Sequence, residues 1–205
     1  MTQRIFLVDD DAAVRSALGR LLGTLDLPVV TCVDGAALFA ALETSQSGCI
    51  VLDLDLPGGS GLEVQQALRQ RRIGMPLIFL TGKGSVASTA QALKAGAFDF
   101  LEKPVDSGLL LSCVRDALAH DATQRERAAL RERAEARLER LTGREREVVV
   151  LTLNGLANKQ IAQRLGISHR TVEIHRARAM QKMGAANLLE LDRMINPVVP
   201  HRRIV

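Results

Sequence analysis

The sequence predicts two domains of different fold class: an α/β domain built on a parallel sheet, and then a small all-helical domain. Three observations support this prediction. Short aliphatic runs alternate with helical stretches up to residue 118, and only helical stretches are found after residue 141. The charge also changes, because residues 1–118 hold 10 Lys/Arg and 13 Asp/Glu, whereas residues 141–205 hold 11 and 5.

The first domain is predicted to contain five strands and five helices in alternation. Alternation of this kind favours a parallel sheet with helices on both faces. The predicted strands are 4–8, 28–33, 49–53, 77–80 and 97–101, and the predicted helices are 12–25, 36–43, 60–71, 85–95 and 106–119.

Residues 119–140 are predicted to continue the last of these helices as a linker. They are rich in Ala, Arg and Glu and contain neither Gly nor Pro. We interpret them as a semi-rigid spacer. The alternative is a thin apolar seam for a partner helix, formed by Leu130 and Leu138. The predicted boundaries are therefore 1–118, 119–140 and 141–205.

The helical domain carries its own start signals. Thr142 followed by Glu145 is a capping box that opens a helix to about Leu153. Asn158 is predicted to cap the next helix, and Ser168 a third helix after a three-residue turn. A last short helix is predicted over 187–194.

Composition limits the classes of function. No apolar stretch approaches 18 residues, so no membrane partner is expected. The three Cys lack metal-site spacing, which indicates reduced thiols in a cytoplasmic protein. There is no Trp or Tyr, so the cores must be aliphatic. The basic second domain indicates an anionic partner.

Acidic residues end two of the predicted strands. Asp9 and Asp10 follow the first strand and Asp53 ends the third. Carboxyl ends of parallel strands meet at one edge of a sheet, so we expect these three to converge. Like charges at close range require a compensating cation. Oxygen ligands without His or Cys favour Mg²⁺.

Two further polar residues fall at the same edge. Thr81 ends the fourth strand, and Lys103 follows the fifth. A hydroxyl donor and a cation beside a metal-bound carboxylate suit a phosphoryl group. The sequence therefore predicts phosphorylation of Asp53.

The helix–turn–helix spacing of residues 158–183 predicts DNA binding. The second helix has an inward stripe that includes His175, which we interpret as a packed histidine. Its opposite face is basic and is predicted to enter the major groove. Lys159, Arg176 and Lys182 are assigned to phosphate contacts. The full set of predicted DNA-contacting residues is Lys159, Arg170, Thr171, Glu173, Ile174, Arg176, Ala177, Arg178 and Lys182.

Four motifs, "LVDDD" (7–11), "VLDLDLPGGSG" (51–61), "FLTGKG" (79–84) and "FDFLEKP" (98–104), resemble the receiver domain of two-component response regulators. The resemblance implies a doubly wound, flavodoxin-like sheet of order 2-1-3-4-5. It also implies that a histidine kinase phosphorylates Asp53. The roles it implies for single residues are Mg²⁺ ligation by Asp9, Asp10, Asp53 and the Asp55 carbonyl, phosphoryl contacts from Thr81 and Lys103, a switch formed by Thr81 and Phe100, and a cis Lys103–Pro104 bond.

The stretch "LTGREREVVVLTLNGLANKQIAQRLGISHRTVEIHRARAMQKMGA" closely resembles the LuxR-type helix-turn-helix domain. Together the two resemblances indicate a FixJ/NarL-type response regulator, nearest the FixJ-like branch. They imply a regulator that dimerises when phosphorylated and binds two promoter half-sites, with RNA polymerase as a further candidate partner. The resemblance also implies that Glu173, Ile174 and Ala177 read bases, because they sit where that family does so. Glu173 either accepts from a cytosine amino group or pairs with Arg170 or Arg176.

Two other functions compete with this interpretation. One is a constitutive DNA-binding regulator whose receiver serves only protein interaction. The other is an enzyme, because Asp53-Leu54-Asp55 resembles the Asp-x-Asp of haloacid-dehalogenase-type phosphotransferases; there, however, the pair should follow the first strand. We favour a regulator that is not an enzyme. Asp55 and Lys83 depart from the usual receiver pattern, and we hypothesise that they pair across the pocket mouth and limit water access.

Overall fold

The computed structural model describes residues 3–42, 47–56, 59–82 and 95–195. The chain forms two compact units, Met1–Gln124 and Arg125–Val205. Within the described ranges, no helix has the length and apolar character that crossing a bilayer requires.

The first unit contains a five-stranded parallel sheet. Its order is β2-β1-β3-β6-β7, which corresponds to the expected 2-1-3-4-5. The predicted fold class is therefore confirmed. The strands are β1 (Gln3–Val8), β2 (Val29–Cys32), β3 (Ser47–Asp53), β6 (Leu77–Thr81) and β7 (Asp99–Glu102).

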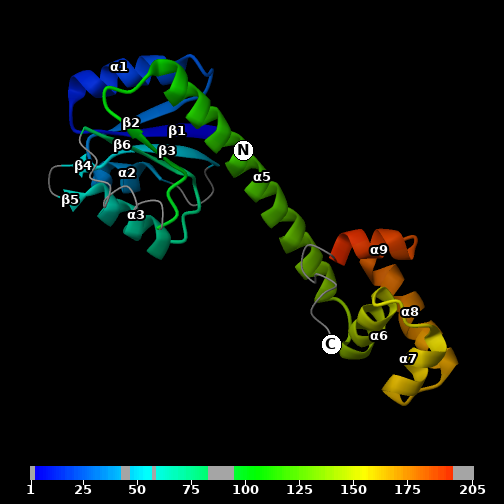
Figure 1. Cartoon of the computed structure of the whole chain (residues 1–205). Coiled ribbons are helices and arrows are strands. Elements are labelled where there is room, and N and C mark those ends of the chain that lie inside the picture. The colour runs from blue at the N-terminus through cyan, green and yellow to red at the C-terminus, as the bar shows by residue number, and fades with distance from the viewer. Residues whose placement is uncertain (1–2, 43–46, 57–58, 83–94, 196–205) are drawn as a thin grey trace. The chain divides into compact units, whose positions relative to one another are not determined.

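Helices cover both faces of this sheet (Figure 1). One face packs against α1 (Ala12–Gly23) and the first part of α5 (Ser107–Leu138), and the other against α2 (Gly35–Ala41) and α3 (Gly61–Gln70). Successive residues of β1 alternate between the two cores, because Ile5 and Leu7 join one and Phe6 and Val8 the other. The helix expected at 85–95 falls outside the described residues.

Strand register places the predicted site residues in one row. Val8 of β1 pairs with Leu52 of β3, so Asp9 and Asp53 follow paired positions. Asp53 in turn pairs with Leu80, and Thr81 pairs with Glu102, the residue before Lys103. Side chains far apart in the chain thus meet at the carboxyl edge of the sheet.

A short hairpin that the sequence did not predict follows β3. Its strands are β4 (Asp55–Leu56) and β5 (Gly59–Ser60), and Ser60 then caps α3 by accepting from the Leu62 amide at 3.2 Å. Gly61 is required here, because a Cβ at this position would lie 2.6 Å from the Asp53 carbonyl oxygen. The hairpin returns the chain tightly over the end of β3.

The second unit is all-helical, as predicted. Its core includes Val149 of α6, Ile161 of α7 and Val172 of α8. The helices after α5 are α6 (Gly143–Leu153), α7 (Asn158–Leu165), α8 (His169–Met183) and α9 (Leu188–Ile195).

The caps of these helices confirm two of three predictions. Thr142 and Glu145 form the expected capping box, and Ser168 caps α8. The cap predicted at Asn158 is wrong. The Gln160 side chain accepts from the Ala157 amide at 2.9 Å, which makes Ala157 the cap and Asn158 the first helical residue.

Helix α5 is continuous from Ser107 to Leu138, as predicted for the linker. In the first unit, the buried Asp121 accepts from the Gly48 amide at 2.9 Å, so helix packing against the sheet extends beyond residue 118. In the second unit, Leu138 is buried in the helical core, whereas Leu130 is 47% exposed. The seam hypothesis is therefore wrong for Leu138, because its own domain covers it.

Candidate functional site

Three carboxylates meet at the edge of the sheet. Oxygen atoms of Asp9, Asp10 and Asp53 all lie within 4.8 Å of one another. Asp9 and Asp53 are buried, at 0% and 5% exposure, whereas Asp10 is exposed. The turn after β1 is held by the Asp11 amide, which donates to Asp9 Oδ1 at 2.9 Å, and Asp11 itself caps α1.

Lys103 joins two of these acids. Its Nζ donates to Asp9 Oδ2 at 2.6 Å and to Asp53 Oδ2 at 2.7 Å. Burial acts against the charge of this ammonium, but the hydrogen bonds and charges of Asp53 and Asp9 outweigh that effect and raise the pKa of Lys103 above its ordinary value. The Asp55 amide donates to the other Asp53 oxygen, Oδ1, at 3.2 Å. The Lys103–Pro104 bond is cis, as expected.

The sequence reasoning missed one residue beside this pocket. Arg15, in α1, donates from Nη1 to the Asp9 carbonyl at 2.7 Å. It therefore fixes the backbone of the acidic turn from the helix that follows. Its position in the first turn of a helix that starts beside the acids is the only signal the sequence offers, and many surface arginines share it.

Thr81, the last residue of β6, has a buried hydroxyl. Among the described residues, Thr81 Oγ1 has no hydrogen-bond partner, although the side chain is 0% exposed. A buried hydroxyl without a partner is costly, so this atom fits the role of a donor to a bound ligand. Phe100, half-buried on the neighbouring strand β7, lies with its ring centroid 6.2 Å from that of Phe79.

The pocket suits a divalent cation. Three carboxylates face one ammonium, which leaves net negative charge in a partly buried site. All the available side-chain ligands are oxygen atoms, as Mg²⁺ prefers. The metal role of the Asp55 carbonyl stays a prediction. Lys83, the other half of the hypothesised gate with Asp55, lies outside the described residues.

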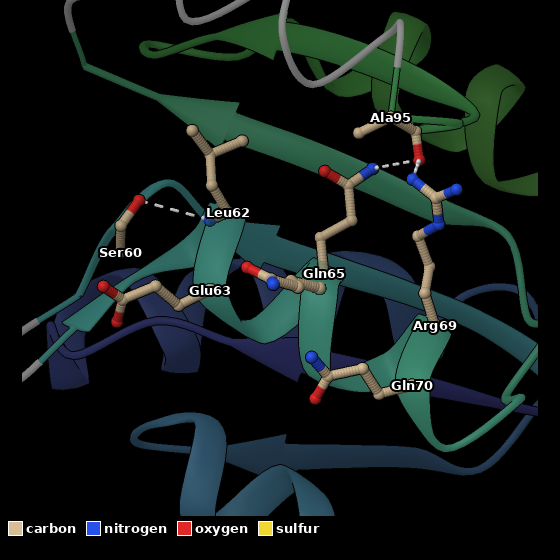
Figure 2. Close-up of a pocket in the computed structure, with 8 residues that line it drawn as sticks. Ser60, Leu62, Glu63, Gln65, Arg69, Gln70 and Ala95 are labelled. Carbon is tan, nitrogen blue, oxygen red and sulfur yellow. Dashed lines mark hydrogen bonds between the residues drawn. The ribbon is translucent and has the colours of Figure 1, made fainter.

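A separate hollow of 770 Å³ lies along α3 and contains none of these acids (Figure 2). Gln65 Nε2 and Arg69 Nη1 both donate to the Ala95 carbonyl, at 3.2 and 3.3 Å (Figure 2). These bonds tie α3 to the residue where the described chain resumes before β7.

The exposed face of α8 carries most of the predicted DNA contacts. The Arg170 side chain is 81% exposed and Ile174 is 39% exposed. Ala177 and Arg178 are exposed on the same helix, as is Lys159 on α7. A hollow of 900 Å³ runs beside this face. The predicted residues that line it are Arg170, Glu173, Ile174, Arg176 and Ala177.

Hydrogen bonds already engage several of these side chains. Glu173 pairs with Arg170 at 3.3 Å, which is one of the alternatives left open by the sequence. Arg176 instead donates to Asn158 at 3.4 Å. The Thr171 hydroxyl lies 2.8 Å from Ser168 Oγ.

The sequence also assigned roles to His175 and Lys182 of α8. His175 is half-buried, which confirms its predicted packing role. Lys182 Nζ lies 2.6 Å from Oε2 of the buried Glu145, and the Lys182 side chain is 38% exposed, so its predicted contact with DNA stays a prediction. The hydrogen bond from Lys182 is also the main reason why the pKa of Glu145 lies below its ordinary value.

Comparison with known families identifies the class of protein. Residues 5–115 match the family described as "Response regulator receiver domain", and residues 139–195 match "Bacterial regulatory proteins, luxR family". The chain belongs to the response regulators that join a receiver domain to a LuxR-type DNA-binding domain.

Its relatives place it within the FixJ-like group of two-component transcription regulators. It is 42% identical over 196 residues to the C4-dicarboxylate transport transcriptional regulatory protein DctR of Rhodobacter capsulatus, covering 95% of this chain and 100% of that protein. It is 44% identical over 190 residues to the transcriptional regulatory protein FixJ of Azorhizobium caulinodans, covering 93% and 90%.

Solved structures of response regulators also match nearly the whole chain. The response regulator StyR matches with a TM-score of 0.81 at 37% identity, covering 97% of this chain and 98% of that one. Full-length FixJ from B. japonicum matches with a TM-score of 0.60 at 35% identity, covering 96% and 98%.

Proposed function

We propose that Asp53 accepts a phosphoryl group from a histidine kinase, and that its phosphorylation controls promoter binding by α8. One observation carries this proposal: the Asp53 carboxylate meets Asp9, Asp10 and Lys103 in a single pocket at the sheet edge. The comparisons support the class of protein, and the pocket supports the choice of Asp53 as the phosphorylated residue.

The chain's own groups are suited to in-line phosphoryl transfer. An Asp53 oxygen attacks the phosphorus atom, the phosphorus–nitrogen bond to the kinase histidine breaks, and its electron pair stays on the imidazole. Lys103 stabilises negative charge on the phosphoryl oxygens. Asp9, Asp10, Asp53 and the Asp55 carbonyl would hold Mg²⁺, which when bound neutralises charge on the transferring group.

The switch follows from the orphaned hydroxyl of Thr81. A phosphoryl group on Asp53 offers this hydroxyl the acceptor that it lacks. Movement of Thr81 leaves space into which the half-buried Phe100 can rotate. Phosphorylation thereby shifts the receiver between two states a few kcal/mol apart.

The readout is DNA binding in the bacterial cytoplasm. The phosphorylated receiver forms a homodimer, which presents two α8 helices to two half-sites in the major groove. Arg170, Ile174 and Ala177 face bases, and Lys159 and Arg178 face phosphates. RNA polymerase is the candidate recipient of the signal.

Incubation with acetyl phosphate and Mg²⁺ tests the proposal. Intact-mass measurement should show the gain of one phosphoryl group in the wild-type chain and none in Asp53→Asn. Release of phosphate from many phosphoesters without a phosphorylated intermediate would instead support the phosphotransferase interpretation. Phosphorylation without any change in promoter footprint would support the constitutive binder.

A further inference from the structure

The recognition helix α8 is held at its far end by a buried carboxylate. Glu145 Oε2 lies 2.6 Å from Lys182 Nζ, and the Glu145 side chain is only 4% exposed. The two residues are 37 positions apart in the chain, one in the first turn of α6 and the other in the last turn of α8. This contact therefore fixes two helices relative to each other.

Glu145 is itself immobilised. The same oxygen, Oε2, accepts from the Thr142 amide at 2.8 Å, and the Glu145 amide donates to Thr142 Oγ1 at 3.3 Å. The next residue, Arg146, donates to the Leu138 carbonyl at 2.9 Å. Lys182 is thus anchored to a rigid corner, where the end of α5 meets α6.

The anchor lies far from the base-reading end of α8. Lys182 is eleven positions after Thr171, which is about 16 Å of helix. A small change of angle at the anchored end therefore displaces the exposed N-terminal half of α8 within the groove. Base contacts tolerate little displacement, whereas non-specific attraction to phosphates tolerates much.

We propose that Glu145 and Lys182 form a clamp that sets the angle of α8, and that both are positioning residues for base readout. The proposal rests on the proposed function, because it assumes that α8 reads DNA. It assigns Lys182 to specificity and not to the general attraction between the basic domain and DNA.

The first test compares Lys182→Met with Lys159→Met, a matched loss of charge on the exposed surface of α7. Binding of the full-length, acetyl-phosphate-treated chain is measured over a salt series, on an operator obtained by in vitro selection and on random DNA. Lys159→Met should weaken both complexes and lower the salt slope by about 0.9. Lys182→Met should leave the slope unchanged and reduce the ratio of specific to random affinity about tenfold.

The second test uses Glu145→Gln. Simple electrostatics and the clamp predict opposite changes in operator affinity for this variant. Loss of an acid from a DNA-binding surface should by electrostatics alone tighten binding to all DNA. The clamp predicts that Glu145→Gln instead weakens operator binding while random DNA is bound at least as well, because Lys182 is freed. The single variant Lys182→Arg can still donate to Glu145. It should therefore keep most of the operator affinity that Lys182→Met loses.

Control measurements separate misfolding from repositioning. Circular dichroism and random-DNA binding should show that each variant keeps a folded, DNA-binding domain. The clamp is wrong if Lys182→Met lowers the salt slope as Lys159→Met does, or if Glu145→Gln leaves the ratio of specific to random affinity unchanged. If the wild-type chain selects no operator at all, the proposed function itself fails, which is a different result.

Discussion

Replacement of Lys103 by Met should make Mg²⁺ bind more tightly to the receiver pocket. The Lys103 ammonium bonds to Asp9 Oδ2 and Asp53 Oδ2, at 2.6 and 2.7 Å. It therefore occupies oxygen atoms that a metal ion would use. The substitution removes this competing cation and leaves the three carboxylates in place.

The size of the effect follows from Coulomb's law. Two unit charges about 4 Å apart interact by about 4 kcal/mol at an effective dielectric constant of about 20. The repulsion in question is that between the Lys103 ammonium and Mg²⁺ bound in the pocket. Asp10 at the rim of the pocket is exposed, so water and salt screen this repulsion. We expect roughly 1–2 kcal/mol to remain, which is about a tenfold lower dissociation constant for Mg²⁺.

The same substitution should destabilise the metal-free protein. Asp9 is 0% exposed, and loss of Lys103 removes the cation that bonds to it, while hydrogen bonds such as that from the Asp11 amide remain. Unpairing a buried charge typically costs roughly 3–5 kcal/mol. Saturating Mg²⁺ should therefore raise the melting temperature of Lys103→Met more than that of the wild type.

Isothermal titration with Mg²⁺ measures the affinity, and thermal unfolding with and without Mg²⁺ measures the linkage. Lys159→Met, in the other domain, is the control and should match the wild type in both. Equal or weaker Mg²⁺ binding by Lys103→Met would refute the view that Lys103 acts as a competing cation in the pocket.

Three further predictions follow from other parts of the fold. The pKa of Glu145 is lowered in the folded state, so its contribution to stability is present at neutral pH and is lost as the pH falls through and below the ordinary glutamate range. In acid titrations the unfolding free energy of Glu145→Gln should therefore depend less on pH than that of the wild type. Gly61→Ala should cost about 1–3 kcal/mol of unfolding free energy in denaturant melts, because its Cβ would lie 2.6 Å from the Asp53 carbonyl oxygen. Burial raises the pKa of both Cys49 and Cys113 to about 12, so iodoacetamide at pH 8 should label them only as fast as the receiver unfolds, and rapid labelling in the native state would contradict this.

The sheet could be predicted because its signals are local. Each strand is an aliphatic run, and the polar residues at the strand ends needed only the rule that parallel strands share a carboxyl edge. The hairpin at residues 55–60 could not be predicted in this way, because two-residue strands have no periodicity. The segment "DLDLPGGSG" reads as a plain loop, yet its glycine at 61 allows the chain to cross close over Asp53.

Partnerships between distant residues were the part that sequence patterns could not reveal. Lys182 looks like any basic residue of a DNA-binding helix, and only its distance from Glu145 shows that it pairs with a buried carboxylate. Leu138 likewise looked free for a partner helix, and only the packed core shows otherwise. The cap at Asn158 failed for a local reason, since the Gln160 side chain accepts from the amide one residue earlier, at Ala157.

Operator binding with and without phosphorylation at Asp53 tests the central claim most directly. The dissociation constant of the full-length chain is measured on one selected operator, at one salt concentration, before and after treatment with acetyl phosphate and Mg²⁺. Wild type should bind about tenfold or more tightly after treatment, and Asp53→Asn should not change. A wild-type chain that gains the phosphoryl group by mass but binds the operator no better would contradict the account, as would an Asp53→Asn chain that responds equally.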